Sequence, residues 1–189
     1  MTGSNCREIL ASTRISIVPQ IEMLSKSMTP EQLITVFSLV AESGSGSFRE
    51  LGVSSNDYSI VPTDLLVAAL TKLEKVVMVQ CNLSAGQLQA LFREIAAADG
   101  SSIVQHLDVS FNPQVGQVPS DLLVAAVSRL ESVRLYNCFL GADQLTAVYR
   151  MVAESRSGRL KEIDCNGNNL SEVSQSLRSR AKLNEDVRI

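Results

Sequence analysis

The stretch Leu130-Glu-Ser-Val-Arg-Leu-Tyr-Asn-Cys-Phe-Leu140 places an apolar residue or Cys at positions 1, 4, 6, 9 and 11 of an eleven-residue line. The same line occurs 57 residues earlier, as Leu73-Glu-Lys-Val-Val-Met-Val-Gln-Cys-Asn-Leu83. A recurrence of this kind is typical of a repeat protein. We therefore expect a chain built from stacked copies of one small unit.

A second version of the line carries Asn at position 9. It occurs at residues 48–58, 104–114 and 160–170, and a weaker copy occupies 18–28. The six lines begin at residues 18, 48, 73, 104, 130 and 160, so the steps between them are 30, 25, 31, 26 and 30 residues. Because long and short steps alternate, the true unit is a pair of unlike repeats.

Each line is expected to form a short β-strand, because its side chains alternate in direction with the two-residue period of a strand. The Asn at position 9 follows this strand, where its amide is suited to bond neighbouring backbone groups as the chain turns, whereas Cys at that position is expected to pack more than it bonds.

The segments between the lines have the spacing of amphipathic helices. The long connector after residue 30 has Leu33, Val36, Phe37 and Val40 at i, i+3, i+4 and i+7, which indicates a helix with one buried face. The short connectors 61–70 and 118–127 begin with Val-Pro followed by Thr or Ser, and Pro with Thr or Ser is common at helix starts. A strand and a helix of this size cannot hide their own apolar faces, so the units must stack to bury a continuous core.

The pattern Leu-x-x-Leu-x-Leu-x-x-Asn/Cys-x-Leu resembles the leucine-rich repeat. Its alternating Cys and Asn versions are similar to the ribonuclease-inhibitor-like subclass, which also forms the repeat domain of nucleotide-binding leucine-rich-repeat receptors. The resemblance covers residues 18–170. It implies an α/β solenoid shaped as a horseshoe arc, with a parallel β-sheet on the concave face and helices on the convex face. A Walker-type Gly-x-x-x-x-Gly-Lys-Ser/Thr loop is missing from the sequence.

We expect residues 1–189 to form one leucine-rich-repeat domain. Residues 1–17 are predicted to form an N-terminal helix. Residues 171–189 are predicted to form a C-terminal helix that is either a polar cap or a truncated further repeat. The segment Val187-Arg-Ile189 resembles the strand residues Val133-Arg-Leu135, as if a seventh strand began there.

Composition favours a soluble cytoplasmic protein. The chain is 45% hydrophobic and 20% charged with a formal net charge of -3, so it has no basic surface for nucleic acid or for an anionic membrane. No apolar run approaches the roughly 18 to 20 residues of a membrane span, and the first residues lack the order of a secretory signal. The four cysteines form no Cys-x-x-Cys pair. They are interpreted as buried structural thiols in a reducing compartment.

A catalytic or cofactor-binding role is not expected. His106, Asp108 and Ser110 fall on one strand face, but same-face residues are roughly 6.6 Å apart, which is too far for a hydrogen-bonded triad. A metal at His106 and Asp108 would lack the three or four converging ligands that a stable site needs. We therefore predict no enzymatic activity, no cofactor and no metal.

The predicted binding site lies on the sheet. Positions 3, 5 and 7 of each line should face away from the core, and Arg134 should lie between Asp108 and Asp164 in one cross-strand ladder. Aromatic and apolar groups beside Arg and a polar rim are typical of interface hot spots. The residues assigned to this partner-binding site are Val77, Val79, His106, Asp108, Phe111, Arg134, Tyr136, Glu162, Asp164 and Asn166.

The predicted function is protein recognition on this sheet face, as in the ligand-sensing domain of an innate-immune type receptor. The expected partner is another protein with a basic patch, and the chain is expected to be a monomer or to self-associate weakly. The alternative is a structural or cytoskeletal scaffold that assembles through its repeat ends.

Overall fold

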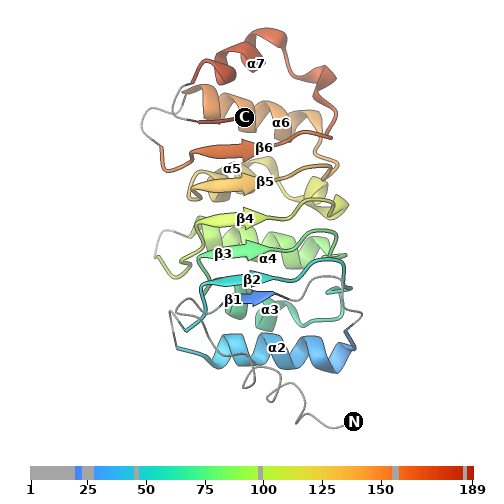
Figure 1. Cartoon of the computed structure of the whole chain (residues 1–189). Coiled ribbons are helices and arrows are strands. Elements are labelled where there is room, and N and C mark those ends of the chain that lie inside the picture. The colour runs from blue at the N-terminus through green and yellow to red at the C-terminus, as the bar shows by residue number, and fades with distance from the viewer. Residues whose placement is uncertain (1–19, 23–27, 45–46, 98–99, 155–157, 185–186) are drawn as a thin grey trace.

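The structure, a computed structural model, describes residues 20–22, 28–44, 47–97, 100–154, 158–184 and 187–189. It has one sheet of six parallel strands in chain order. The strands are β1 (Gln20–Glu22), β2 (Glu50–Gly52), β3 (Lys75–Val77), β4 (His106–Asp108), β5 (Ser132–Arg134) and β6 (Glu162–Asp164). Figure 1 shows them side by side along an elongated stack.

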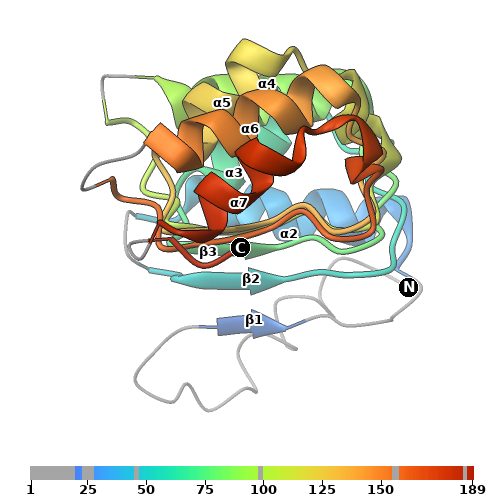
Figure 2. The same cartoon turned by 90° about the horizontal axis from the view of Figure 1, so that it is seen from above.

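Helices connect successive strands and all lie on one side of the sheet (Figure 2). The α-helices are α2 (Pro30–Glu42), α3 (Thr63–Leu70), α4 (Ala85–Ala96), α5 (Ser120–Val127), α6 (Ala142–Glu154) and α7 (Gln175–Lys182). Two 3₁₀ helices, η1 (Pro113–Gln117) and η2 (Leu170–Glu172), precede α5 and α7. This arrangement confirms the expected α/β fold with a parallel sheet and stacked strand–helix units.

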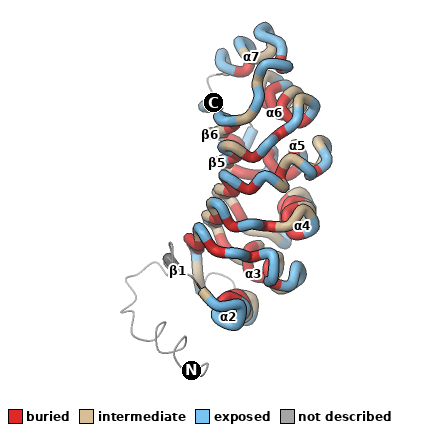
Figure 3. Tube along the Cα trace, turned by 90° about the vertical axis from the view of Figure 1, so that its right-hand side faces the viewer, coloured by how far each residue is buried: buried red, intermediate tan, exposed pale blue. Residues whose placement is uncertain are grey.

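The strand register matches the alignment of the lines. Leu51, Val76, Leu107, Val133 and Ile163 all stand at position 4 and pair directly across the sheet. Each is buried on the helix side, so the core runs without interruption through the stack (Figure 3). The helix stripe predicted for residues 33–40 is also buried. Burial of these apolar side chains is the main favourable term in folding.

The long helices α2 and α4 begin with capping boxes. In α4, the Ser84 side chain accepts a hydrogen bond from Gln87 N, and the Gln87 side chain accepts one from Ser84 N. The amide nitrogen Nε2 of Gln87 also donates to the carbonyls of Tyr58 (2.8 Å) and Val61 (2.7 Å) in the preceding unit. This buried glutamine therefore caps the start of α4 and also links that helix to the preceding unit.

The short helices start where the sequence predicts, but without the expected side-chain cap. Pro62 and Pro119 are the N-cap residues, Thr63 and Ser120 are the first helical residues, and neither helix has a side-chain cap hydrogen bond. Proline lacks an N–H to satisfy and has a fixed φ, so it ends the preceding loop without a hydroxyl cap.

The Asn residues at position 9 bond the backbone as predicted. Asn112 is fully buried, and its Oδ1 accepts from Cys81 N (3.0 Å) and Leu83 N (3.4 Å). Its Nδ2 donates to the carbonyls of Met78, Val109 and Ser110. Asn168 repeats this pattern one repeat pair further along the stack. Each Asn thus joins its own turn to the turn before it.

The cysteines at position 9 bond more than the sequence suggests. The Sγ of Cys81 donates to Val53 O (2.8 Å) and that of Cys138 to Val109 O (3.2 Å). Both thiols are fully buried and free, as is the buried Cys165. Burial raises the pKa of each of these three thiols to about 12. The prediction of buried structural thiols is confirmed for these three, and Cys6 lies outside the described residues.

The two ends differ in what can be described. The helix predicted for 1–17 and the start of the first line at residue 18 lie outside the described residues. At the other end, Arg188 forms a parallel bridge with Glu162, with Arg188 N donating to Lys161 O and Ile163 N donating to Arg188 O. The segment resembling a strand start therefore pairs with β6 as a strand would.

Candidate protein-binding surface

The sheet face turned away from the helices carries an open groove of about 440 Å³ over β4, β5 and β6. We call it the sheet groove. Its lining residues are Val79, Asp108, Ser110, Phe111, Arg134, Tyr136, Glu162, Ile163, Asp164, Arg188 and Ile189. Seven of the ten residues assigned to a binding site from sequence therefore line one depression.

The register of the parallel strands brings the charged residues of the groove together. Asp108 pairs with Arg134, and Arg134 with Asp164, so the predicted ladder forms. The guanidinium of Arg134 lies 4.0 Å from Asp108 Oδ2 and 3.9 Å from Glu162 Oε1. The ladder suggests that Arg134 pairs with Asp164 on β6, but its ion pair on that strand is with Glu162. Both separations are at the outer limit for an ion pair, and Arg134 is 59% exposed, so these contacts are weak.

The carboxylates of Asp108 and Asp164 are oriented by local hydrogen bonds. Asp108 Oδ1 accepts from Ser110 N (3.0 Å), and Asp164 Oδ1 accepts from Asn166 N (2.9 Å) and Asn166 Nδ2 (2.8 Å). The same side-chain turn thus recurs one repeat pair apart. It orients two carboxylates that line the groove, and the second oxygen of Asp108 lies near Arg134.

Two aromatic rings border the groove. The centroids of Phe111 and Tyr136 are 5.2 Å apart with the planes tilted by 54°, a favourable aromatic contact. Phe111 is 42% and Tyr136 39% exposed. The structure therefore places both rings on the surface.

Exposed aromatic residues are concentrated in one part of the molecule. The chain has eight Phe and Tyr residues and no Trp. Of these, Phe111, Tyr136 and Phe139 are the exposed ones among the described residues, and all three follow β4 or β5. Phe139 is 71% exposed and was not assigned to the site from sequence.

The backbone at Phe111 and Phe139 is strained. Their φ angles are 59° and 55°, in the left-handed region. The equivalent turn positions are also left-handed, but there the chain uses Ser55, Gln80, Asn82, Asn137 and Gly167. For a residue with a Cβ this conformation costs roughly 1–2 kcal/mol, and a bulky residue there is an outlier. Strain of this kind concentrates at functional sites.

Three predicted site residues lie outside the groove lining. Val77 and His106 are half-buried on the sheet, and Asn166 is exposed and bonded to Asp164. His106 Nδ1 lies 2.9 Å from Ser132 Oγ on β5, which is a cross-strand contact. Ser110, expected to face solvent, is 5% exposed. The His106, Asp108 and Ser110 side chains are therefore not presented together on one open face.

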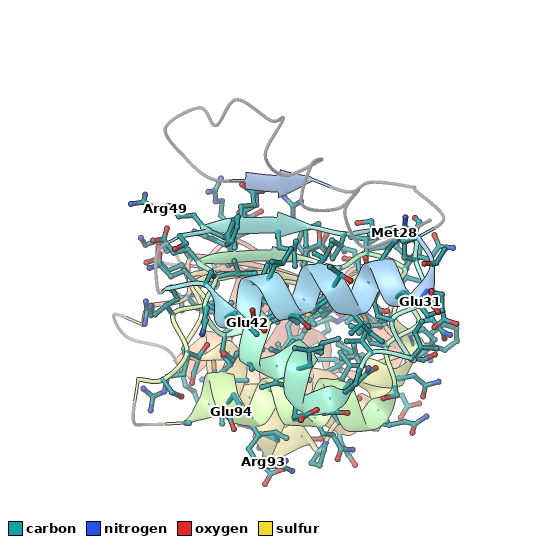
Figure 4. All side chains as sticks on the ribbon, turned by 90° about the horizontal axis from the view of Figure 1, so that it is seen from below. Met28, Glu31, Glu42, Arg49, Arg93 and Glu94 are labelled. Atoms are coloured by element: carbon teal, nitrogen blue, oxygen red, sulfur yellow. The ribbon has the colours of Figure 1, made fainter. Side chains whose placement is uncertain are left out.

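The helix side has a different character. Figure 4 shows Glu31 and Glu42 at opposite ends of α2, and Arg93 and Glu94 on the outside of α4. A second open depression, of about 590 Å³, lies over α3 and α4 and is lined by small and polar residues such as Thr63, Ala68 and Ala90. It lacks aromatic side chains, so the sheet groove is the better candidate for partner binding.

Within the residues that the structure covers, no group of three or more His, Cys, Asp or Glu side chains is arranged to hold a metal ion. Nor does any helix in that part of the chain have the length and apolar character to cross a bilayer.

Comparison with protein-family models and with curated proteins finds no match to this chain. The assignment of its function therefore rests on the repeat pattern and on the geometry of the sheet groove.

Proposed function

We propose that this chain is a leucine-rich-repeat module of the ribonuclease-inhibitor-like kind, which recognises another protein on its sheet face. The sheet groove is the observation that carries the proposal. It combines two exposed aromatic rings in contact with a set of charged side chains whose mutual ion pairs are weak. Aromatic residues and Arg surrounded by a polar rim are the composition of interface hot spots.

The proposed partner presents a basic residue to the groove. The charged lining side chains are Asp108, Glu162 and Asp164 against Arg134 and Arg188, which gives three negative and two positive groups. Arg134 is exposed and held loosely, so a partner's cation can displace it from Asp108. The rings of Phe111 and Tyr136 add cation–π attraction for the same group.

The fold supports rigid display of this surface. The side chains of Asn112, which is buried, and Asn168, which is half-buried, bond the backbone of neighbouring turns. Side chains displayed on a sheet held in this way lose little conformational entropy when a partner binds. In this proposal the chain is a curved solenoid with the sheet on its concave face. It is a monomer or self-associates weakly, and it acts without catalysis or a cofactor. The proposal also includes a cytoplasmic setting, supported by the buried free thiols, and a sensing role of the innate-immune type.

A random peptide library displayed on phage, selected on the wild-type protein, tests the proposal. We expect enriched peptides to contain Lys or Arg. Phe111→Ser combined with Tyr136→Val should weaken their binding by about tenfold or more, or roughly 1.4 kcal/mol. Ser55 and Val79 hold the corresponding positions of the preceding repeat pair, so the variant should fold. Asp108→Lys should slow association most at low salt.

The matched control is Arg93→Ala with Arg150→Ala on the helix side, which should leave peptide binding unchanged. A selection that enriches no peptide, or peptides that bind the groove variant as tightly as wild type, contradicts the proposal.

A further inference from the structure

The two strained phenylalanines have no structural explanation inside the fold. Positions 8 and 10 of the repeat line take the left-handed conformation in several turns, so the turn itself requires that backbone. Phe111 and Phe139 do not supply the core with buried area in return, because they are 42% and 71% exposed. In the preceding repeat pair the same conformation is held by Gln80 and Asn82, and Asn tolerates this conformation well.

Phe139 lies beyond the sheet groove but close to it. It follows Tyr136, a groove residue, by three positions in the same turn. Three residues of fully extended chain span at most about 11 Å, so the two Cα atoms are no farther apart than that. An extended partner segment covers the same distance with about three residues.

We infer that Phe139 is a second anchor for the partner of the sheet groove, one that receives a bulky apolar side chain. This inference rests on the proposed function. The partner segment would place its basic residue between the carboxylates of Asp108 and Asp164 and beside the rings of Phe111 and Tyr136. An aromatic or large aliphatic residue within about three positions of that basic residue would then pack on Phe139.

The charge distribution favours this occupant over a purely apolar one. The groove itself has carboxylates from β4 and β6 on both sides of Arg134. Phe139 is flanked in sequence by the uncharged residues Cys138 and Leu140, both of them buried. A segment with one basic and one apolar residue therefore matches the carboxylates of the groove and the exposed ring of Phe139.

The peptides selected on the wild-type protein provide the probe. Phe139→Asn installs the residue of the equivalent turn position, Asn82. We expect it to raise the dissociation constant of those peptides about tenfold, measured by fluorescence anisotropy, while the urea midpoint of unfolding stays equal or rises. The control, Ile60→Asn, changes another exposed apolar residue in the preceding repeat pair, and should leave peptide affinity unchanged.

The outcomes separate the inference from the proposed function. If Phe139→Asn binds the peptides as tightly as wild type while Phe111→Ser with Tyr136→Val does not, the second anchor is wrong and the groove stands. If both variants bind like wild type, the proposed function fails as well. A clearly lower urea midpoint for Phe139→Asn would make Phe139 a structural residue and overturn the inference. Enriched peptides without an apolar residue within three positions of the basic one would also overturn it.

Discussion

The repeat pair containing β2, α3, β3 and α4 and the pair containing β4, η1, α5, β5 and α6 are nearly identical inside and different outside. Leu66 and Leu123 occupy one core position, Cys81 and Cys138 another, and Gln87 and Gln144 a third. Gln144 even donates to the carbonyls of Val115 and Val118 as Gln87 does to its own preceding turn. The buried framework of one pair is therefore a copy of the other.

On the surface the same two pairs diverge. Where the first pair has Val77, Val79 and Asn82, the second has Arg134, Tyr136 and Phe139. The first set shows that this fold does not need exposed aromatics or charge at these positions. Under the proposed function, the second pair supplies the exposed aromatic side chains of the binding surface, while the buried residues common to both pairs supply stability.

The largest effect is expected at the shared framework. Asn112→Ala would leave the buried carbonyls of Met78 and Val109 and the amide of Cys81 without their side-chain partner. Each unsatisfied buried polar group costs about 1–3 kcal/mol, so we expect a loss of about 3 kcal/mol or more in urea unfolding. Asn166→Ala, an exposed change beside the groove, should cost less than about 0.5 kcal/mol. Equal losses of stability in the two variants would mean that the hydrogen bonds of Asn112 do not hold neighbouring units together.

A medium effect is expected from glycine positions that differ between the pairs. A Cβ at Gly116 in η1 would lie 2.3 Å from the backbone oxygen of Phe139, whereas one at Gly86 in α4 meets nothing within 4 Å. Gly116→Ala should therefore destabilise the fold by about 2 kcal/mol through overpacking. Gly86→Ala should stabilise it by up to about 1 kcal/mol, because Ala is the better helix former. Thermal unfolding of both variants measures the contrast, and the same sign for both would contradict it.

The smallest effect on stability is expected at the two equivalent buried thiols, those of Cys81 and Cys138. Burial raises the pKa of Cys81 and of Cys138 from the ordinary 9.0 to about 12. The folded state thus keeps protons that the unfolded state loses above pH 9. Their contribution to stability is complete below pH 9 and is lost as the pH rises toward 12. Between pH 9 and 10 each thiol should account for roughly 1 kcal/mol of lost stability.

The thiol prediction compares the two pairs directly. Cys81→Ala and Cys138→Ala should each make the decline of urea stability above pH 9 less steep, and by the same amount. In a Cys6→Ser background, a thiol reagent at pH 8 should label the folded protein slowly and the unfolded protein rapidly. Fast labelling of the folded protein would show that burial does not protect the thiols. Unlike pH slopes for the two variants would show that the two positions are not equivalent.

Much of the fold could be predicted because packing imposes a period on the sequence. The apolar positions of the lines predicted the strands and the ladder from Asp108 to Arg134, whereas the parallel sheet was expected from the resemblance to the leucine-rich repeat. The helix stripes followed from the 3.6-residue period. The missing hydroxyl caps at Thr63 and Ser120 were not predicted, because the same residues suit the N-cap and the first turn, and only the backbone conformation distinguishes them.

The candidate site could be predicted less completely. Six of its residues lie at positions 3, 5 or 7 of a line, whose direction follows from the strand period, and a seventh, Phe111, lies in the turn that follows β4. Arg188 and Ile189 were not assigned to the site, although residues 187–189 resemble the start of a strand. They reach the groove through the pairing of Arg188 with Glu162 of β6. Phe139 was missed because position 10 lies in a turn, where side-chain direction has no period.

The amino-acid pattern was enough to predict the number and spacing of the units and the residues that must be buried, since apolar side chains can be hidden only by stacking. The parallel sheet was expected from the resemblance to the leucine-rich repeat. Only the folded structure shows which carboxylate pairs with Arg134 and that Ser110 is buried. It also shows that Phe111 and Phe139 are exposed on a left-handed backbone. These features depend on side-chain positions and on dihedral angles set by neighbouring turns. A pattern of apolar residues along the chain carries no information about either.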